Sequence, residues 1–434
     1  MNKVLLGVAV VCICSACGAP SLRYKYEVNQ LAAAGKFEEA ARKVTAKQRT
    51  YGKRDKILYN LDRASLLHDA QEPAPSDTLF AQAQQQITDS YTQSITAHTA
   101  QFFINDLTTA YNAADYETAL TFFYRAMNFL QQKDVRSAAV EARKAVFFLD
   151  HLRASQKKGY TDDPFVQYVS SLVFESVGEL SDARIARENA LRAYQKYGWP
   201  VPQFHVPDNA SEYGEIILFH YAGQVPLKKS QTIQLAWNDI LAFANTPVEN
   251  GGPVSPEVQN AVYAGLTGSA ITVSYPVLET QPYHVVSSAA RVNGQQIPLQ
   301  QMTDISALLK QDLDRKMPGI WFRLATRAVL KRVAAVQARH AVENASSDKK
   351  NNSTGWLAEM VVSAFGAALE KADTRQWFTL PASIYMTRVF VVPGPQQIAL
   401  LLRDENGNII GEYKFDTITV RAGERVFLHH RTAY

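Results

Sequence analysis

The apolar periodicity of this 434-residue chain changes completely at one point, and that change limits the folds open to it. From residue 30 to Tyr197, apolar side chains recur at helical spacing, alanine is abundant, and glycine and proline are sparse. The segment Tyr197–Pro200 ends this pattern with a glycine and a proline, which both interrupt helices. Beyond it, apolar runs of strand length alternate with turn residues. The sequence therefore predicts a multidomain α+β protein whose first part is all-α.

A short motif recurs within the helical part, in which a turn residue is followed about five positions later by alanine. The residues expected to pack these repeats are Gly35 and Ala40, Ala138, and Phe174, Gly178, Ala183 and Ala190. Glycine lets the chain reverse between antiparallel helices, and alanine lets two helix backbones approach closely. We therefore predict a degenerate tetratricopeptide-like helical array over residues 30–198. Its spacing is uneven against the ~34 residues of a regular unit, so an irregular helical bundle is the alternative.

The proline-rich segment Glu72–Asp77 is predicted to interrupt this array, with Ser76 or Asp77 capping the next helix. After Pro200, the strongest local signal is Asn293-Gly294, which predicts a tight hairpin between strands 284–292 and 295–299. The remaining expected elements are strands 215–221, 232–237 and 270–275, helices 304–315, 318–342 and 356–371, and strands 384–392, 397–403, 409–415, 417–421 and 425–430. This order predicts an α+β middle domain over residues 205–375 and a small β-sandwich-like C-terminal domain over residues 381–434.

The first residues of the chain combine a positive charge with a short apolar run. Lys3 precedes the apolar segment Val4–Ile13, which is too short to span a bilayer, since a spanning helix needs ~20 residues. Small residues then lead to Cys17, a pattern typical of an export signal. The cysteine directly after small residues resembles the lipobox of bacterial lipoproteins. That resemblance implies a signal peptide over residues 1–16, acylation of the Cys17 thiol, and a tether over residues 17–29. An ordinary secretory signal with an incidental cysteine is the alternative.

Cysteine usage agrees with a lipid-bearing cysteine. The three cysteines all lie within the first 17 residues, so cleavage before Cys17 leaves a single cysteine to carry the lipid. A lipid on Cys17 is the only covalent group expected, and no cofactor is expected. In lipoproteins of two-membrane bacteria an aspartate after the cysteine tends to retain the protein in the inner membrane. Gly18 therefore implies sorting to the outer membrane, with the protein facing the periplasm.

Motifs of catalysis and metal binding are weak in this sequence. It contains no phosphate-binding glycine loop, no HExxH motif and no nucleophile elbow, so we assign no catalytic residue. Asp404–Asn408 begins like a calcium loop but lacks the later ligands, and a hairpin turn is the better interpretation. His429 and His430 are adjacent on a strand and must face opposite sides. We expect them to be terminal surface residues, and we assign no metal site.

Three charged features remain. Arg323, Arg327 and Lys331 lie four residues apart on one helix face, which favours either a polyanion or membrane contact or simply a solvated face. Asp373 and Arg375 are placed to pair, and Trp377 to pack between domains; a ligand site formed by these residues is the alternative. The net charge of +4 is too small to favour nucleic acid as a partner.

The chain also resembles one family over most of its length. The segments Gly214–Phe219, Gly223–Lys228 and Ala372–Pro381 are similar to those of uncharacterised bacterial lipoproteins, which combine tetratricopeptide-like helices, an α+β region and a small terminal β-domain. The resemblance implies this architecture and an envelope location, and it brings no catalytic residues. We expect a scaffold or regulator of an envelope assembly machine, for cell-wall synthesis, pilus assembly or secretion. Its envelope protein partners would bind through the helical array. The alternative is an envelope enzyme acting on peptidoglycan or polysaccharide.

Overall fold

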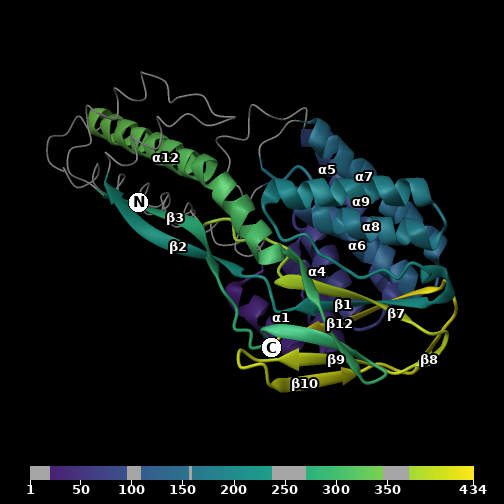
Figure 1. Ribbon diagram of the computed structural model, residues 1–434. Helices are drawn as coiled ribbons and strands as arrows, with labels where there is room; N and C mark the ends of the chain where they lie inside the picture. The colour runs from purple at the N-terminus through teal and green to yellow at the C-terminus, as the bar shows by residue number, and fades with distance from the viewer. Residues whose placement is uncertain (1–19, 95–108, 156–158, 237–269, 346–370) are drawn as a thin grey trace.

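The computed structural model describes residues 20–94, 109–155, 159–236, 270–345 and 371–434 (Figure 1). A helical first part is followed by a region rich in strands, so the mixed α+β class is confirmed. The helices of the first part are α1 (Leu22–Ala33), α2 (Phe37–Ala46), α3 (Gln48–Tyr51), α4 (Lys56–Asp69), α5 (Pro73–Ser94), α6 (Asp115–Gln131), α7 (Val135–Ala154), α8 (Pro164–Ser176) and α9 (Leu180–Tyr197). A short 3-10 helix, η3 (Ala210–Glu212), precedes the first strand.

The later part of the chain supplies the strands and one long helix. The strands are β1 (Gly214–Ala222), β2 (Leu227–Ala236), β3 (Ala270–Glu279), β4 (Ser287–Val292), β5 (Gln295–Pro298), β6 (Gln300–Asp304), β7 (Ser383–Val391), β8 (Gly394–Gln396), β9 (Ile398–Arg403), β10 (Ile409–Lys414), β11 (Ile418–Val420) and β12 (Arg425–Thr432). The long helix is α12 (Ile305–Ala345). The predicted hairpin at Asn293-Gly294 is confirmed, because both residues have positive φ and β4 pairs with β5 across them.

Four helical hairpins share one turn geometry: α1–α2, α4–α5, α6–α7 and α8–α9. The turn residues with positive φ are Gly35, Gln71, Lys133 and Gly178. Each donates its N–H to the carbonyl three residues back, and the next N–H reaches the carbonyl five residues back, at 2.9–3.2 Å. These paired bonds form a Schellman turn, which satisfies the last carbonyls of the first helix. The residues five positions after the turn are Ala40, Ser76, Ala138 and Ala183, each at most 2% exposed.

The expectation for Glu72–Asp77 is therefore wrong. This segment does not interrupt the helices, because Gln71 makes the same turn as the other three hairpins and α5 begins directly at Pro73. Proline suits a first helical turn, where its missing N–H has no partner to lose. Ser76 is buried inside α5 and donates its hydroxyl to the carbonyl of Ala64 at 2.8 Å. Neither Ser76 nor Asp77 caps the helix.

The strands form two four-stranded sheets and two smaller strand pairs. The first sheet has the order β12-β1-β7-β6, with β1 parallel to β12 and antiparallel to β7. The second sheet is antiparallel with the order β10-β9-β4-β5. Figure 1 shows the helical hairpins on one side of the first sheet and the second sheet on the other. The body of the protein therefore has three layers.

Strand β1 lies in the middle layer and is buried along its whole length. Ile217, Phe219 and Tyr221 point into the core shared with the helices. Ile216 and Leu218 point into the core between the two sheets. Successive side chains of a strand face opposite sides, so a strand covered on both faces needs a continuous apolar run.

Two of the expected segment boundaries are corrected by this arrangement. Residues 22–29 are not a tether, since they form most of α1, whose Tyr24 and Val28 are buried in the core. The predicted boundary between residues 205–375 and 381–434 does not separate two sheets. Strand β1 pairs with β7 and β12, and β4 pairs with β9, so each sheet contains strands from both sides of that boundary.

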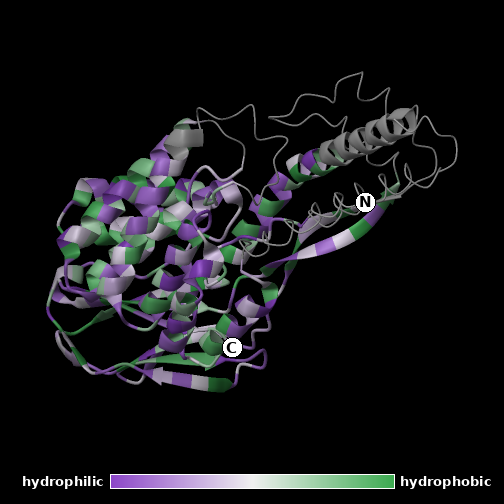
Figure 2. Cartoon of the chain, turned by 180° about the vertical axis from the view of Figure 1, so that it is seen from behind, coloured by the Kyte–Doolittle hydropathy of each residue, from purple (hydrophilic) through white to green (hydrophobic). Residues whose placement is uncertain are grey.

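Helix α12 and the ribbon of β2 and β3 project from the body as an arm (Figures 1 and 2). The ribbon contains ten paired positions, from Leu227↔Glu279 to Ala236↔Ala270. The two helices predicted at 304–315 and 318–342 are one helix that continues through Pro318. Because Pro318 has no N–H, the Asp314 carbonyl lacks its usual helical hydrogen bond. Both residues are exposed, so this carbonyl is open to water. The predicted helix at 356–371 lies outside the described residues except for Lys371, which is not helical.

Candidate functional site

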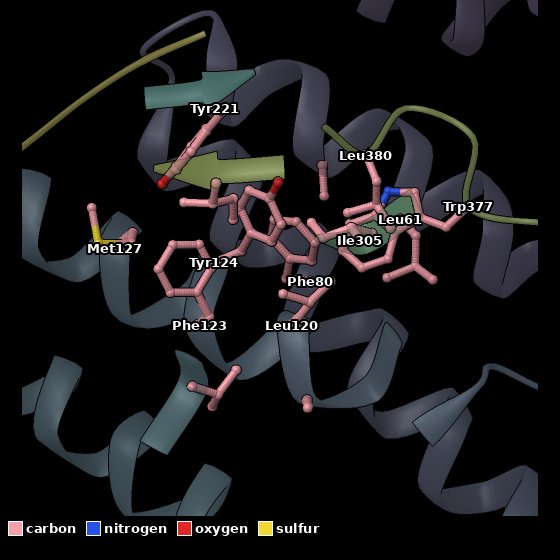
Figure 3. Packing of buried hydrophobic residues seen from close by; sticks show 14 of the residues in the cluster. Leu61, Phe80, Leu120, Phe123, Tyr124, Met127, Tyr221, Ile305, Trp377 and Leu380 are labelled. Carbon is pink, nitrogen blue, oxygen red and sulfur yellow. The ribbon is translucent and has the colours of Figure 1, made fainter. Parts of the chain in front are cut away.

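The inner face of the helical layer is filled by the chain itself. Figure 3 shows Phe80 and Tyr124 of the helices packed with Trp377 and Leu380, which precede β7. The Trp377 side chain is 1% exposed, and its ring centroid lies 5.7 Å from that of Phe80 and 5.6 Å from that of Tyr124. The prediction that Trp377 packs between the helical and sheet regions is confirmed. The face of the helical layer that points toward the sheet is therefore occupied by the protein's own residues.

Buried polar contacts hold this segment against the helices. The guanidinium of Arg375 binds both carboxylate oxygens of Asp373, at 2.9 and 2.8 Å, which confirms the predicted pair. The same guanidinium reaches Asp55, beside α4, at 3.1 Å. Asp62 accepts hydrogen bonds from the Tyr51 hydroxyl at 3.0 Å and the Phe378 N–H at 3.2 Å. Burial raises the pKa of Asp62 to about 8. The hydrogen bonds and ion pairs of Arg375 and Asp62 are made to other residues of the fold, so we interpret these two residues as structural.

A stacked pair of histidines lies next to this junction. The rings of His68 on α4 and His429 on β12 are 4.2 Å apart and nearly parallel, and Tyr221 stacks on both. Nδ1 of His68 lies 2.7 Å from the side-chain oxygen of Asn128. Burial lowers the pKa of His68 to about 4 and that of His429 well below its usual value. Both rings are therefore neutral near pH 7.

The outcome for the two adjacent histidines is mixed. His429 and His430 do face opposite sides of β12, as predicted, because His430 stacks on Tyr413 of the second sheet at 3.7 Å. They are not surface residues, since His429 is 5% exposed and His430 is partly buried. The reason is that β12 lies between the helical layer and the second sheet, and the sequence does not reveal which layers cover a strand.

An open cleft of about 600 Å³ lies at the outer side of β12, and we call it the edge cleft. One wall is the α1–α2 turn, another is the end of β12 with Tyr434, and Tyr413 of β10 and the end of α4 complete it. In this turn Gly35 adopts φ +72°, a left-handed conformation that glycine reaches at lower cost than residues with a Cβ. The lining of the edge cleft includes Lys36, Phe37, Asp69, His430, Arg431 and Tyr434.

Asp69 and Arg431 are the buried charged pair of the edge cleft, at 7% and 5% exposure. Nη1 of Arg431 lies 3.9 Å from Oδ2 of Asp69, which is too long for a hydrogen bond. Nη2 donates to the Leu380 carbonyl at 3.2 Å. Oδ1 of Asp69 and Nε and Nη1 of Arg431 have no hydrogen-bond partner among the described residues. Burial raises the pKa of Asp69 to about 7, and the nearby guanidinium opposes that rise.

Most of the residues predicted to pack the repeats are buried in the helical layer, and the two glycines are exposed turn residues. Gly35 and Gly178 are turn residues with positive φ. The others are at most 2% exposed: Ala40, Ala138, Phe174, Ala183 and Ala190. Arg323, Arg327 and Lys331 all lie on α12, but the side chains of Arg327 and Lys331 are outside the described side chains. Cys17 and Gly18 also lie outside the described residues. The Asp404 carboxylate accepts N–H groups from Asn406 and Asn408, which confirms a hairpin turn there.

Sequence reasoning did not identify the edge cleft. Asp69 and Arg431 lie near opposite ends of the chain, and no spacing relates them. The one available signal was the adjacent His68-Asp69 pair at the end of a helical pattern, which by itself is unspecific. Among the described residues no group of three or more His, Cys, Asp or Glu is placed to hold a metal ion. No described helix is long and apolar enough to cross a membrane.

Comparison of the chain with protein-family models, with curated proteins and with solved structures finds no match in any of the three.

Proposed function

We propose that this protein is an outer-membrane lipoprotein, anchored through a lipid on Cys17 and sorted by Gly18. In the periplasm it acts as a protein-binding scaffold or regulator of an envelope assembly machine. The helical part is then a tetratricopeptide-like array, supported by four hairpins with one turn geometry and a small buried residue five positions later. The strand-rich part is β-sandwich-like, supported by the apolar core between the two four-stranded sheets.

The observation that carries the binding role is the arm of α12 with the β2–β3 ribbon. The inner face of the helices is filled by Trp377 and its neighbours, so a partner needs another surface. The ribbon extends away from the body, and most side chains of β2 from Ser230 onward are exposed or half-buried. An exposed two-stranded ribbon is marginal on its own, so a projecting one gains stability from what it contacts. The outer faces of the helices are the alternative partner surface.

The edge cleft favours a second candidate function, an envelope enzyme acting on peptidoglycan or polysaccharide. It places a carboxyl group with a pKa of about 7, that of Asp69, beside an open cavity. Such a pKa suits a general acid or base near neutral pH. A shifted pKa in a cleft is also common in structural pairs, and Asp69 faces Arg431.

Complementation of a deletion strain separates the two functions. One variant lacks residues 231–275, with Asn-Gly joining Ser230 to Pro276, which face each other in the ribbon register. The scaffold function predicts that this variant fails to complement at normal abundance on immunoblots. Asp69→Asn keeps the shape of the side chain and should complement at least partly. The reverse result, an inactive Asp69→Asn variant and an active arm deletion, would replace the scaffold by the enzyme.

The membrane anchor has its own test. Cys17→Ala should abolish incorporation of labelled palmitate and leave the precursor uncleaved by the lipoprotein signal peptidase. Normal maturation of this variant would exclude lipidation. Gly18→Asp should move the protein toward inner-membrane density fractions, and a wild-type protein that already sediments there would contradict outer-membrane sorting.

A further inference from the structure

Strand β10 is the outermost strand of the second sheet, so one of its edges has no strand partner in the described part of the chain. Figures 1 and 2 show this strand at the outer margin of the body, on the side away from the helices. Every residue of β10 except Gly411 is exposed, including Ile409, Ile410 and Tyr413. A sheet edge that is open to solvent along its length accepts an added strand.

The printed register shows which main-chain groups of β10 point to the open edge. Along a strand in an antiparallel pair, the N–H and C=O of one residue point to the same edge, and successive residues alternate. The Phe415 N–H donates to the Ile398 carbonyl beside it at 3.0 Å, and the pairing of β10 with β9 is regular from Gly411 to Lys414. Tyr413 therefore also faces β9, and the main-chain groups of Glu412 and Lys414 point outward.

The side chains at this edge form a short charged pattern around an aromatic ring. Tyr413 stacks on His430 of the first sheet at 3.7 Å, so its ring lies on the inner face of the second sheet. Glu412 and Lys414 lie on the outer face, where the Glu412 carboxylate pairs with Arg291 of β4. The Lys414 side chain is 78% exposed, and its Nζ lies 3.9 Å from Glu412.

The pattern Glu412-Tyr413-Lys414 is complementary to itself. When two copies of β10 run antiparallel about a two-fold axis at Tyr413, each Glu412 lies opposite Lys414 of the other copy. Opposite charges in directly facing positions stabilise a strand pair, whereas like charges destabilise it. A two-fold axis at Glu412 or at Lys414 would place like charges opposite each other. An exposed edge lysine commonly prevents pairing, but here it selects one register.

From these features we infer that the open edge of β10 binds β10 of a second copy of this chain. In the register centred on Tyr413, Glu412 and Lys414 of the two copies exchange main-chain hydrogen bonds, and the two second sheets become one continuous sheet. The occupant is a second copy because the charge pattern of the edge matches its own reverse. This interface involves neither the arm nor the lipid, so it goes beyond the proposed function.

The contact is one strand wide, which is small beside the ~1,200–2,000 Å² that stable interfaces bury, so a covalent trap is the appropriate test. The full chain with Cys12→Ser, Cys14→Ser and Cys17→Ser has no thiol of its own. It is kept in detergent, oxidised and analysed on non-reducing gels. Tyr413→Cys in this chain should give a disulfide-linked dimer, because facing Cα atoms in such a pair are ~4.5 Å apart. Glu412→Cys, which faces residue 414, and Asp182→Cys, exposed on α9, should stay monomeric.

Charge exchange tests the register itself. In the Tyr413→Cys chain, Glu412→Lys or Lys414→Glu places like charges opposite each other and should slow disulfide formation about fivefold. An equal mixture of these two variants should recover the rate of the unexchanged chain, since in the mixed dimer every lysine faces a carboxylate.

Three results would overturn the inference. They are a Tyr413→Cys chain that stays monomeric on oxidation, equal crosslinking of the Asp182→Cys chain, and a mixture of the charge variants that reacts no faster than either alone. A Tyr413→Cys chain that in cells forms a disulfide only with a different protein would assign the edge to that partner instead. None of these results bears on the arm, so the scaffold function is tested separately by complementation.

Discussion

Trp377→Ala should destabilise the whole protein, because this side chain joins the helical layer to the sheet. Its ring is 1% exposed and lies against Phe80 and Tyr124. Its Nε1 donates to the hydroxyls of Ser65 and Thr379, which are 2.6 Å from each other and remain paired after truncation. The substitution leaves neither hydroxyl without a hydrogen-bond partner. The loss in the free energy of unfolding is therefore that of the cavity, about 3–5 kcal/mol for a buried tryptophan.

The assay is urea unfolding followed by far-ultraviolet circular dichroism, with hydrogen exchange at selected urea concentrations. Trp199→Ala is the matched control and should cost less, since Trp199 is only partly buried at the end of α9. Amides of α4 and β1 should lose protection together, because they share one core. A loss below about 1 kcal/mol, or helices that stay protected after the sheet has opened, would refute a single packed unit.

Three further changes test local packing and charge. Gly214→Ala should lower the stability by about 1–3 kcal/mol in thermal unfolding, because the new Cβ would lie 2.3 Å from a methyl carbon of Val420; a neutral effect would contradict the packing. Ala183→Trp should cost about 1–3 kcal/mol by overpacking, whereas Leu180→Trp, at an exposed site of the same helix, should be nearly neutral; equal effects would contradict the burial. Burial lowers the pKa of His430 to about 4, so its stabilising contribution is full above pH 6.5 and is lost as the pH falls toward 4. His430→Phe should reduce that acid loss in urea midpoints measured between pH 7 and 4, and an unchanged pH profile would contradict it.

The sequence predicted those features of the fold that depend on residues close together in the chain. The Asn293-Gly294 turn, the Asp373–Arg375 pair and the change from helices to strands all follow from neighbouring residues. The turn at Gln71 was interpreted as an interruption of the helices, because Gln71 adopts positive φ, a conformation that the sequence signals only for glycine and asparagine. The turn before Ala138 was expected from the repeat motif, although the positive φ of Lys133 was not. The helical geometry around them outweighs their intrinsic preference.

Long-range pairing could not be predicted from the sequence. Strand β1 pairs with β12 from the far end of the chain. The apolar pattern of a strand does not identify the strand with which it pairs. The edge cleft depends on that pairing, because it places Arg431 opposite Asp69. The filled inner face of the helices depends on where residues 373–380 dock, and no local pattern in the sequence predicts that docking.

Site-specific photo-crosslinking in living cells tests the scaffold function most directly. A photoreactive residue is placed at Gln231, exposed on the ribbon of the arm, and in separate strains at Asp182 on the outer side of α9 and at Glu405 in the β9–β10 turn. The proposed function predicts one defined protein adduct from Gln231 and none from Glu405. An adduct from Asp182 alone would move the partner to the outer face of the helices, and no protein adduct from any of the three positions would contradict the scaffold function.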